Sequence, residues 1–252
     1  MKLYKTITLV SILLLFPYLL WAQEMDAKAI VKKSDEKLRG NSNKATMSMR
    51  IVRPDWERSM SLKSWSKGQD YSLVLVTAPA KDKGTVSLMR EKELWNWMPS
   101  IERTIKISPS MMSQSWMGSD FTNDDLLKQS SIVEDYNHTL EAEEEVSGFD
   151  CYKIKLMPKP DAPVVWGKIE LWISKEEFHQ VKAAYYDEDE YLVNEMQAYD
   201  PATMDDREIL TRLEMRPVDE EGHKTVITYE DIDFDINISE SFFSLQNMRR
   251  VR

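Results

Sequence analysis

The 252-residue sequence is poor in the residues that most small catalytic and cofactor sites need. It has one cysteine, Cys151, so no disulfide can form within the chain. Its 7 glycines form no Gly-rich run, which excludes a phosphate-binding loop and a dinucleotide fingerprint. Its 3 histidines stand apart, without a partner at a recognised metal-ligand spacing. We therefore expect no cofactor and no metal centre.

Clustered positive charge is also scarce. The chain has 33 Lys and Arg against 43 Asp and Glu, a net charge of −10, and its one basic group is the tail Arg249, Arg250 and Arg252. Binding to a phosphate backbone needs concentrated Lys and Arg, so we expect no nucleic-acid partner. The acidic balance favours solubility.

The N-terminus has the pattern of a secretory signal peptide. Two lysines precede the apolar stretch Ile7–Leu20, and the small residue Ala22 follows it. A membrane-spanning helix needs about 20 apolar residues, and this stretch is shorter and contains a proline. We predict a signal peptide over 1–22 and a single domain over 23–252. Because no cysteine stands near the cleavage site, the mature chain is expected to be exported without a lipid anchor.

Hydrophobic residues alternate with polar ones along most of the chain. Met47, Met49 and Ile51 alternate with Ser48 and Arg50, which is the period of a strand with one apolar face. Turn residues separate the segments, as in an antiparallel meander. A flat sheet of that width is rare, so we predict a mainly β fold, an unclosed antiparallel barrel. The strand-like segments are 44–53, 57–67, 71–78, 84–90, 93–98, 101–107, 136–146, 150–157, 164–174, 179–187, 190–199, 207–216 and 223–234.

Two segments depart from this alternation. Residues 26–39 have the spacing of an amphipathic helix, followed by the stop signals Gly40 and Asn41. Residues 108–130 have no period-two pattern, and Thr122–Asp125 resembles a capping box before a short helix near Asn123. We predict that both segments cover the concave face of the barrel and could act as lids.

The polar residues give little support for catalysis. The histidines His138, His179 and His223 lie in three different strand-like segments and are read as ordinary strand residues. The carboxylate runs 141–145 and 187–190 fit a solvated strand edge and a hairpin tip better than a glycosidase pair. Cys151 is read as a small packed residue. We expect no enzymatic activity.

Methionine and tryptophan are abundant, with 15 and 8 copies. Methionine is flexible and polarizable, so a curved sheet lined with Met and Trp could enclose an acyl chain. The alternative is that these side chains fill a solid core. The residues that we predict to line or cover an apolar cavity are Leu75, Trp95, Trp97, Met111, Met112, Trp116, Met117 and Phe121.

The segment Met117–Leu126, MGSDFTNDDL, resembles the LolA-like outer-membrane lipoprotein-sorting proteins. The stretch Trp95–Pro99 with Arg103, and Ile169–Ser174 followed by Val181 and Lys182, are similar to the same family. The resemblance implies an unclosed antiparallel β-barrel with helices on its concave side. It also implies a periplasmic carrier that shelters lipoprotein or lipid acyl chains. The cargo-gating arginine of the best-understood carriers does not align with Arg50, Arg53 or Arg58, so the hand-off mechanism is not carried over.

The sequence thus predicts a periplasmic carrier or chaperone for acyl chains of lipoproteins or lipids. The resemblance suggests an inner-membrane transporter and an outer-membrane acceptor as partners. The alternative is a non-carrier interaction module, a filled barrel that docks to an envelope transporter or assembly complex. A third interpretation, an enzyme acting on lipid or glycan, would need one of the histidines to meet a carboxylate in the cavity.

Overall fold

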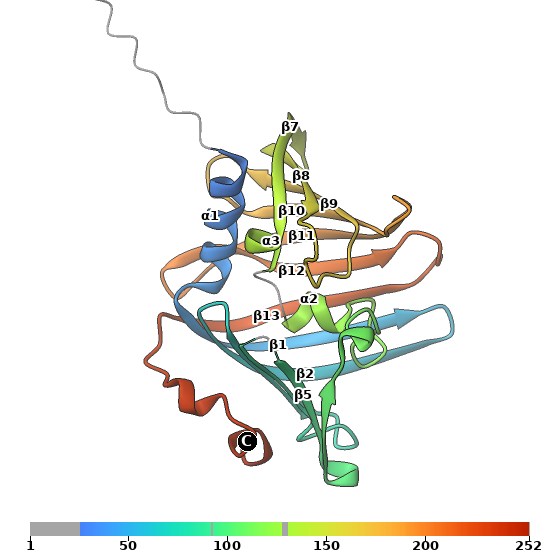
Figure 1. Cartoon of the computed structure of the whole chain (residues 1–252), viewed down its shortest axis with the longest axis vertical. Helices are drawn as coiled ribbons and strands as arrows, with labels where there is room; N and C mark the ends of the chain where they lie inside the picture. The colour runs from blue at the N-terminus through green and yellow to red at the C-terminus, as the bar shows by residue number, and fades with distance from the viewer. Residues whose placement is uncertain (1–25, 92, 128–130, 252) are drawn as a thin grey trace, which may run out of the picture.

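The computed structural model describes residues 26–91, 93–127 and 131–251 (Figure 1). The predicted signal peptide, residues 1–22, lies outside the described residues. In the described part of the chain the strands form one antiparallel sheet in the order β6-β5-β4-β3-β2-β1-β13-β12-β11-β10-β9-β8-β7. The fold is mainly β and the sheet is unclosed, with β6 and β7 as its edges. The predicted fold class is confirmed.

Strands that are neighbours in the sequence pair with each other, except the edge strands β6 and β7, and β1 also pairs with β13. The sheet is therefore two meanders joined at its centre. The strands are β1 Ser42–Arg53, β2 Trp56–Lys67, β3 Tyr71–Ala78, β4 Val86–Arg90, β5 Glu93–Met98, β6 Arg103–Ile107, β7 Tyr136–Val146, β8 Phe149–Pro158, β9 Lys168–Ser174, β10 Gln180–Tyr186, β11 Leu192–Met204, β12 Arg207–Pro217 and β13 Lys224–Phe234.

Two of the strand boundaries that differ from the prediction lie beside a glycine and a proline. β9 begins at Lys168 rather than at 164, and Gly167 before it lies so close to Asp187 that an added Cβ would be 2.4 Å from the Asp187 carbonyl oxygen. β11 continues past Pro201 to Met204. The pairing of β10 with β11 reaches only to Gln197, so the missing N–H of Pro201 lies where no β10 partner is present.

The alternation buries one face of the sheet in the main core. In β1, Ala45, Met47, Met49 and Ile51 are all at most 8% exposed. They belong to the largest apolar cluster, which gathers residues from both halves of the sheet and from the segments over the concave face. The concave face therefore carries the main apolar core.

The predicted N-terminal helix is α1, Ala27–Arg39, and it lies over the concave side (Figure 1). Asp26 caps it by accepting a hydrogen bond of 2.8 Å from the Ala29 N–H. Ile30 and Val31 are its buried apolar residues. Within the described residues, no helix is long and apolar enough to span a bilayer.

Residues 108–135, here called the insert, connect the two edge strands and contain the short helices α2 Asn123–Leu127 and α3 Ser131–Glu134. The predicted capping box is present. The Thr122 N–H donates to the Asp125 carboxylate at 2.8 Å, and the Asp125 N–H donates to the Thr122 hydroxyl at 3.1 Å. The insert lies with α1 over the concave face, as predicted (Figure 1).

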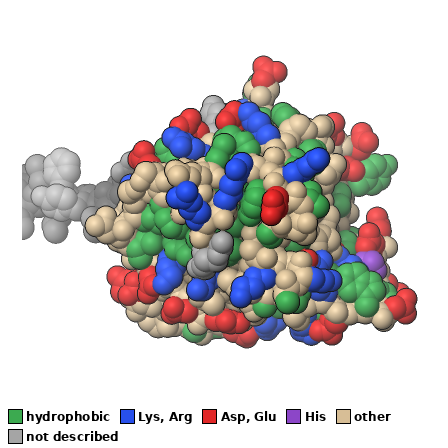
Figure 2. Space-filling model, turned by 90° about the horizontal axis from the view of Figure 1, so that it is seen from below, with side chains coloured by type: hydrophobic (Ala, Val, Ile, Leu, Met, Phe, Trp, Pro, Cys, Tyr) green, Lys and Arg blue, Asp and Glu red, His purple; other side chains and the backbone are tan. Residues whose placement is uncertain are grey.

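A second apolar cluster lies on the opposite, convex face of β2–β5. It is covered by residues 236–251, the C-terminal segment, which contains the 3-10 turns η3 Glu240–Phe242 and η4 Asn247–Arg249. Phe243 and Met248 from this segment are 0% exposed. Figure 2 shows the molecule from this side, with Lys and Arg over the middle of the view and most Asp and Glu toward its margins. β3 is thus apolar on both faces, and this segment covers its convex face.

Candidate ligand-binding hollow

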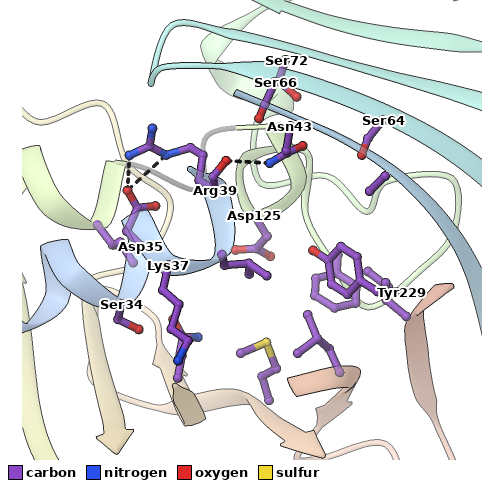
Figure 3. Close-up of a pocket in the computed structure, with 18 of the residues that line it drawn as sticks. Ser34, Asp35, Lys37, Arg39, Asn43, Ser64, Ser66, Ser72, Asp125 and Tyr229 are labelled. Carbon is purple, nitrogen blue, oxygen red and sulfur yellow. Dashed lines mark hydrogen bonds and ion pairs between the residues drawn. The ribbon is translucent and has the colours of Figure 1, made fainter. Parts of the chain in front are cut away.

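A partly open cavity of about 220 Å³ lies between the concave face, the second half of α1 and the insert (Figure 3). We call it the hollow. Most of its wall is apolar and comes from strands of both halves of the sheet. The apolar wall residues include Ala45, Met47, Leu62, Val74, Met89, Trp116, Phe121, Ile169, Leu171, Met196, Ile209, Ile227 and Ile232.

The hollow reaches the surface between the C-terminal end of α1 and the β2–β3 turn. Gly68 and Gln69 of that turn line it, together with Asp35, Lys37 and Arg39 of α1. Each of these α1 charges is paired: Arg39 with Asp35 at 2.5 Å, and Lys37 with Glu177 at 2.6 Å. The charged side chains at this opening therefore neutralise one another.

Three neighbouring strands change from polar to apolar at the same level of the hollow. At the opening, Asn43, Ser66 and Ser72 lie side by side on β1, β2 and β3, and we call them the mouth row. The next level is Ala45, Ser64 and Val74, and the third is Met47, Leu62 and Val76. The polar side chains of the first two levels are labelled in Figure 3. The hollow is thus polar at its opening and apolar further in.

Deeper in the hollow, Asp125 of α2 holds the insert to the loop before β9. Its carboxylate accepts from the Trp166 indole N–H at 2.8 Å and from the Thr122 N–H at 2.8 Å. Burial raises the pKa of Asp125, and these hydrogen bonds act against that rise. Asp125 is also one of the residues that line the hollow.

Tyr229 of β13 presents its hydroxyl to the hollow, and Figure 3 shows the ring pointing inward. The residue is 9% exposed, and burial raises its pKa to about 12. No hydrogen bond joins this hydroxyl to another of the described residues. It is therefore a neutral hydrogen-bond donor available to a ligand.

The MGSDF part of the insert is bound to the sheet by a buried ion pair. Both Arg53 guanidinium nitrogens donate to the two Asp120 carboxylate oxygens, at 2.8 and 3.1 Å, and one also donates to the Gly118 carbonyl at 3.1 Å. The Thr225 hydroxyl of β13 donates to the same carboxylate at 2.7 Å. Arg58 reaches the Met117 carbonyl at 3.2 Å. The segment that carries the family resemblance is the one that attaches the insert.

The predicted cavity residues separate into two groups. Trp116 and Phe121 line the hollow, and the Trp116 indole donates to the Ser87 hydroxyl at 3.0 Å. Met112 is buried in the same core, and Met111 and Met117 pack against it. All five come from the insert.

Leu75, Trp95 and Trp97 lie outside the hollow. Leu75 is buried in the convex-face cluster, and the two tryptophans pack against that cluster. Strand parity explains the placement: on β3 it is Val74 that faces the hollow, so Leu75 must face away. Alternation along β3 predicts that Leu75 and Val74 lie on opposite faces, but it does not indicate which of the two faces is concave. As a ligand-binding set, the eight residues remain a prediction.

The polar residues considered for catalysis have structural partners. His179 lines the hollow, is 5% exposed, and has its Nε2 3.2 Å from Glu208 Oε1. Burial lowers its pKa, and the Glu208 contact acts in the opposite direction. His138 Nε2 lies 2.7 Å from the Ile132 carbonyl, and His223 pairs with Glu220. Among the residues that the structure describes, no three His, Cys, Asp or Glu side chains gather as a metal site.

Large apolar side chains are exposed at one rim of the barrel. Trp56 is in the β1–β2 hairpin, Ile101 in the β5–β6 turn, Tyr191 before β11 and Val218 after β12, and they are 48–71% exposed. Strand direction places these turns at the same end of the sheet. The mouth row is at the opposite end.

The unclosed sheet, with a helix and an insert over an apolar concave face, is a LolA-like fold. A family model described as "Uncharacterized protein" matches residues 68–250, so the chain belongs to that family, and its fold resembles that of a LolA superfamily protein. The search of the curated proteins finds no match.

Three solved structures resemble the chain over most of its length. A DUF1329 family protein from Desulfovibrio piger is 25% identical, covering 88% of this chain and 97% of that one, with a TM-score of 0.80. A LolA superfamily protein from Nitrosomonas europaea is 25% identical, covering 88% and 99%, with a TM-score of 0.76. A domain assigned to the outer membrane lipoprotein-sorting proteins, from Vibrio parahaemolyticus, is 20% identical, covering 89% and 98%, with a TM-score of 0.79.

Proposed function

We propose that the chain is a periplasmic carrier that binds acyl chains of lipoproteins or lipids in the hollow, without catalysing a reaction. The observation that carries the proposal is the apolar hollow itself, open at one end and covered by two separate segments, α1 and the insert. The relatives of like fold include a lipoprotein-sorting domain, which supports the same class of cargo.

Burial of the acyl chain would supply the affinity, at about 0.8 kcal/mol for each methylene removed from water. The cavity of about 220 Å³ is smaller than pockets for drug-sized ligands, which hold roughly 300–1,000 Å³. A long acyl chain therefore requires α1 or the insert to move outward. The same movement would allow release to an acceptor.

The direct test is the identity of bound material. We expect native mass spectrometry and lipid extraction, applied to protein purified from its own periplasm, to find a bound acyl lipid or lipoprotein fragment. In parallel, the neutral apolar probe N-phenyl-1-naphthylamine should bind the purified protein and be displaced by acyl ligands. If no lipid is recovered and the probe does not bind, the carrier proposal is wrong.

A matched pair of variants places the binding in the hollow. Ala45→Leu adds an apolar side chain to the wall of the hollow, where Ala45 is 2% exposed. Excluding about two methylenes of ligand should weaken probe binding on the order of tenfold. Ser48→Leu, on the opposite face of the same strand, is the control and should bind normally. Equal binding by both variants would place the ligand elsewhere.

The second candidate, a docking module without cargo, is favoured by the exposed apolar rim. Trp56 and Tyr191 are 52% and 71% exposed in turns at the end of the sheet opposite the mouth row, and neither lines the hollow. A partner such as an envelope transporter or outer-membrane acceptor could contact this rim. The docking module predicts that Trp56→Ser with Tyr191→Ser fails to complement a deletion strain, whereas Ala45→Leu complements it. If this result is obtained and no lipid is recovered from the purified protein, the docking module replaces the carrier.

A further inference from the structure

The mouth row contains hydrogen-bonding groups without partners. The Ser66 hydroxyl oxygen is buried and has no hydrogen-bond partner within residues 26–91, 93–127 and 131–251. The Ser72 and Ser64 hydroxyls form no side-chain hydrogen bond with the other described residues, and both line the hollow. Because a buried unpaired hydroxyl carries a desolvation cost, a ligand group that pairs with it is favoured. Asn43 is held in place by its hydrogen bond to the Arg39 carbonyl, at 2.9 Å.

We propose that the mouth row, with Ser64, binds the uncharged glycerol-ester or amide linkage of an acyl ligand whose tail occupies the apolar part of the hollow. This inference rests on the proposed carrier function and adds the chemical class of the head region. Along β1, β2 and β3 the lining changes from polar at the opening to apolar further in. This sequence matches the polar head and the apolar tail of such an amphiphile. Serine hydroxyls are suitable donors to ester and amide carbonyl oxygens.

The charges at the opening favour an uncharged head over a phosphate. The two cations that line it, Lys37 and Arg39, are each paired with a carboxylate. The Arg39 and Asp35 side chains are 14% and 6% exposed, so separating that pair would leave a charge in a poorly hydrated place. An anionic head would have to break one of these pairs, whereas an ester or amide carbonyl would not.

Tyr229 supplies an independent second donor. Tyr229 pairs with Met47 of β1, which lies two levels deeper in the hollow than Asn43. The Tyr229 hydroxyl faces the hollow. A head with a single carbonyl would use only the mouth row. A ligand with two carbonyl groups, as in a diacylated glycerol, can also place an acceptor near Tyr229.

The test compares pyrene-labelled diacylglycerol with pyrene-labelled phosphatidylglycerol and with N-phenyl-1-naphthylamine. The full-length mature protein should bind diacylglycerol more tightly than phosphatidylglycerol. Ser66→Ala with Ser72→Ala should lower diacylglycerol affinity on the order of tenfold, since two neutral hydrogen bonds are lost. The apolar probe, which has no carbonyl, should bind this variant as well as the parent.

Ser59→Ala with Ser61→Ala, on the convex face of β2, is the matched control and should change none of the three affinities. A diacylglyceryl-cysteine peptide distinguishes the source of the head: tighter binding than diacylglycerol indicates a lipoprotein, and equal binding indicates a free lipid.

The inference is overturned, with the carrier proposal intact, if the mouth-row variant binds diacylglycerol normally or if phosphatidylglycerol binds more tightly. Failure of all ligands to bind the parent protein overturns both proposals.

Discussion

Two arginines three residues apart on β1 form ion pairs of very different character. The Arg53 and Asp120 side chains are 12% and 6% exposed and form a bidentate salt bridge. Arg50 and Glu57 meet at 3.1 Å with side chains 49% and 52% exposed. Water screens the second pair, whereas the first has little access to water. The two residues are therefore a natural comparison.

Arg53→Ala is expected to lower the free energy of unfolding by about 3–5 kcal/mol, because it leaves the Asp120 carboxylate buried without its cation. Arg50→Ala should cost about 0–1 kcal/mol. Urea denaturation followed by tryptophan fluorescence measures both. Equal effects of the two substitutions would show that the Asp120 contact does not hold the insert.

At the scale of elements, the C-terminal segment acts as a cover for a face of the sheet that would otherwise be an exposed apolar patch. Phe242 packs against Trp65 with ring centroids 5.4 Å apart, and Phe243 against Tyr71 at 5.5 Å. The segment has almost no regular secondary structure, so its packing depends on these aromatic side chains rather than on backbone pairing.

Phe243→Ser should destabilise the protein by about 3–5 kcal/mol and increase binding of an apolar surface dye, because Phe243 is 0% exposed. Leu245→Ser in the same segment is the control. Leu245 is 42% exposed, so its replacement should change stability by no more than about 0.5 kcal/mol. Thermal melts with and without the dye measure both effects. Unchanged dye binding for Phe243→Ser would contradict the covering role.

At the scale of the whole molecule, two histidines from different strands give the stability a common pH dependence. Burial lowers the pKa of both His138 and His179 in the folded state. The unfolded chain takes up these protons near the ordinary value of about 6.5, before the folded chain does. Stability is therefore fully present above that pH and falls as the pH drops below it.

The melting temperature should accordingly decrease from pH 7.5 to about pH 5.5, on the order of 2–4 °C for each kcal/mol lost. The double variant His138→Gln with His179→Gln should show a smaller decrease over the same interval. Carboxylates whose pKa is lowered by a Lys or Arg partner, such as Glu141 beside Lys155 and Asp200 beside Arg212, lose their contribution only at more acidic pH. If the variant matches the parent between pH 7.5 and 5.5, other groups control the decrease.

Local patterns in the sequence predicted most of the architecture. Alternation identified the strands, residues 26–39 the helix, and Thr122–Asp125 the start of α2, because each of these depends on residues a few positions apart. The unclosed barrel followed from the number of strands and from the MGSDF resemblance. The aromatic side chains of the C-terminal segment were a signal for its covering role, but no period marked it as an element.

The sequence by itself determined which residues share a face of a strand, since side chains alternate with a period of two. Only the tertiary structure decided which of those faces became the hollow. Leu75 and Val74 are equally apolar neighbours, and the sheet curves toward Val74 while the C-terminal segment covers Leu75. The mouth row also required the structure, because Asn43, Ser66 and Ser72 become neighbours only through the pairing of β1, β2 and β3. Curvature and register arise from contacts between distant segments, and those contacts leave no local pattern.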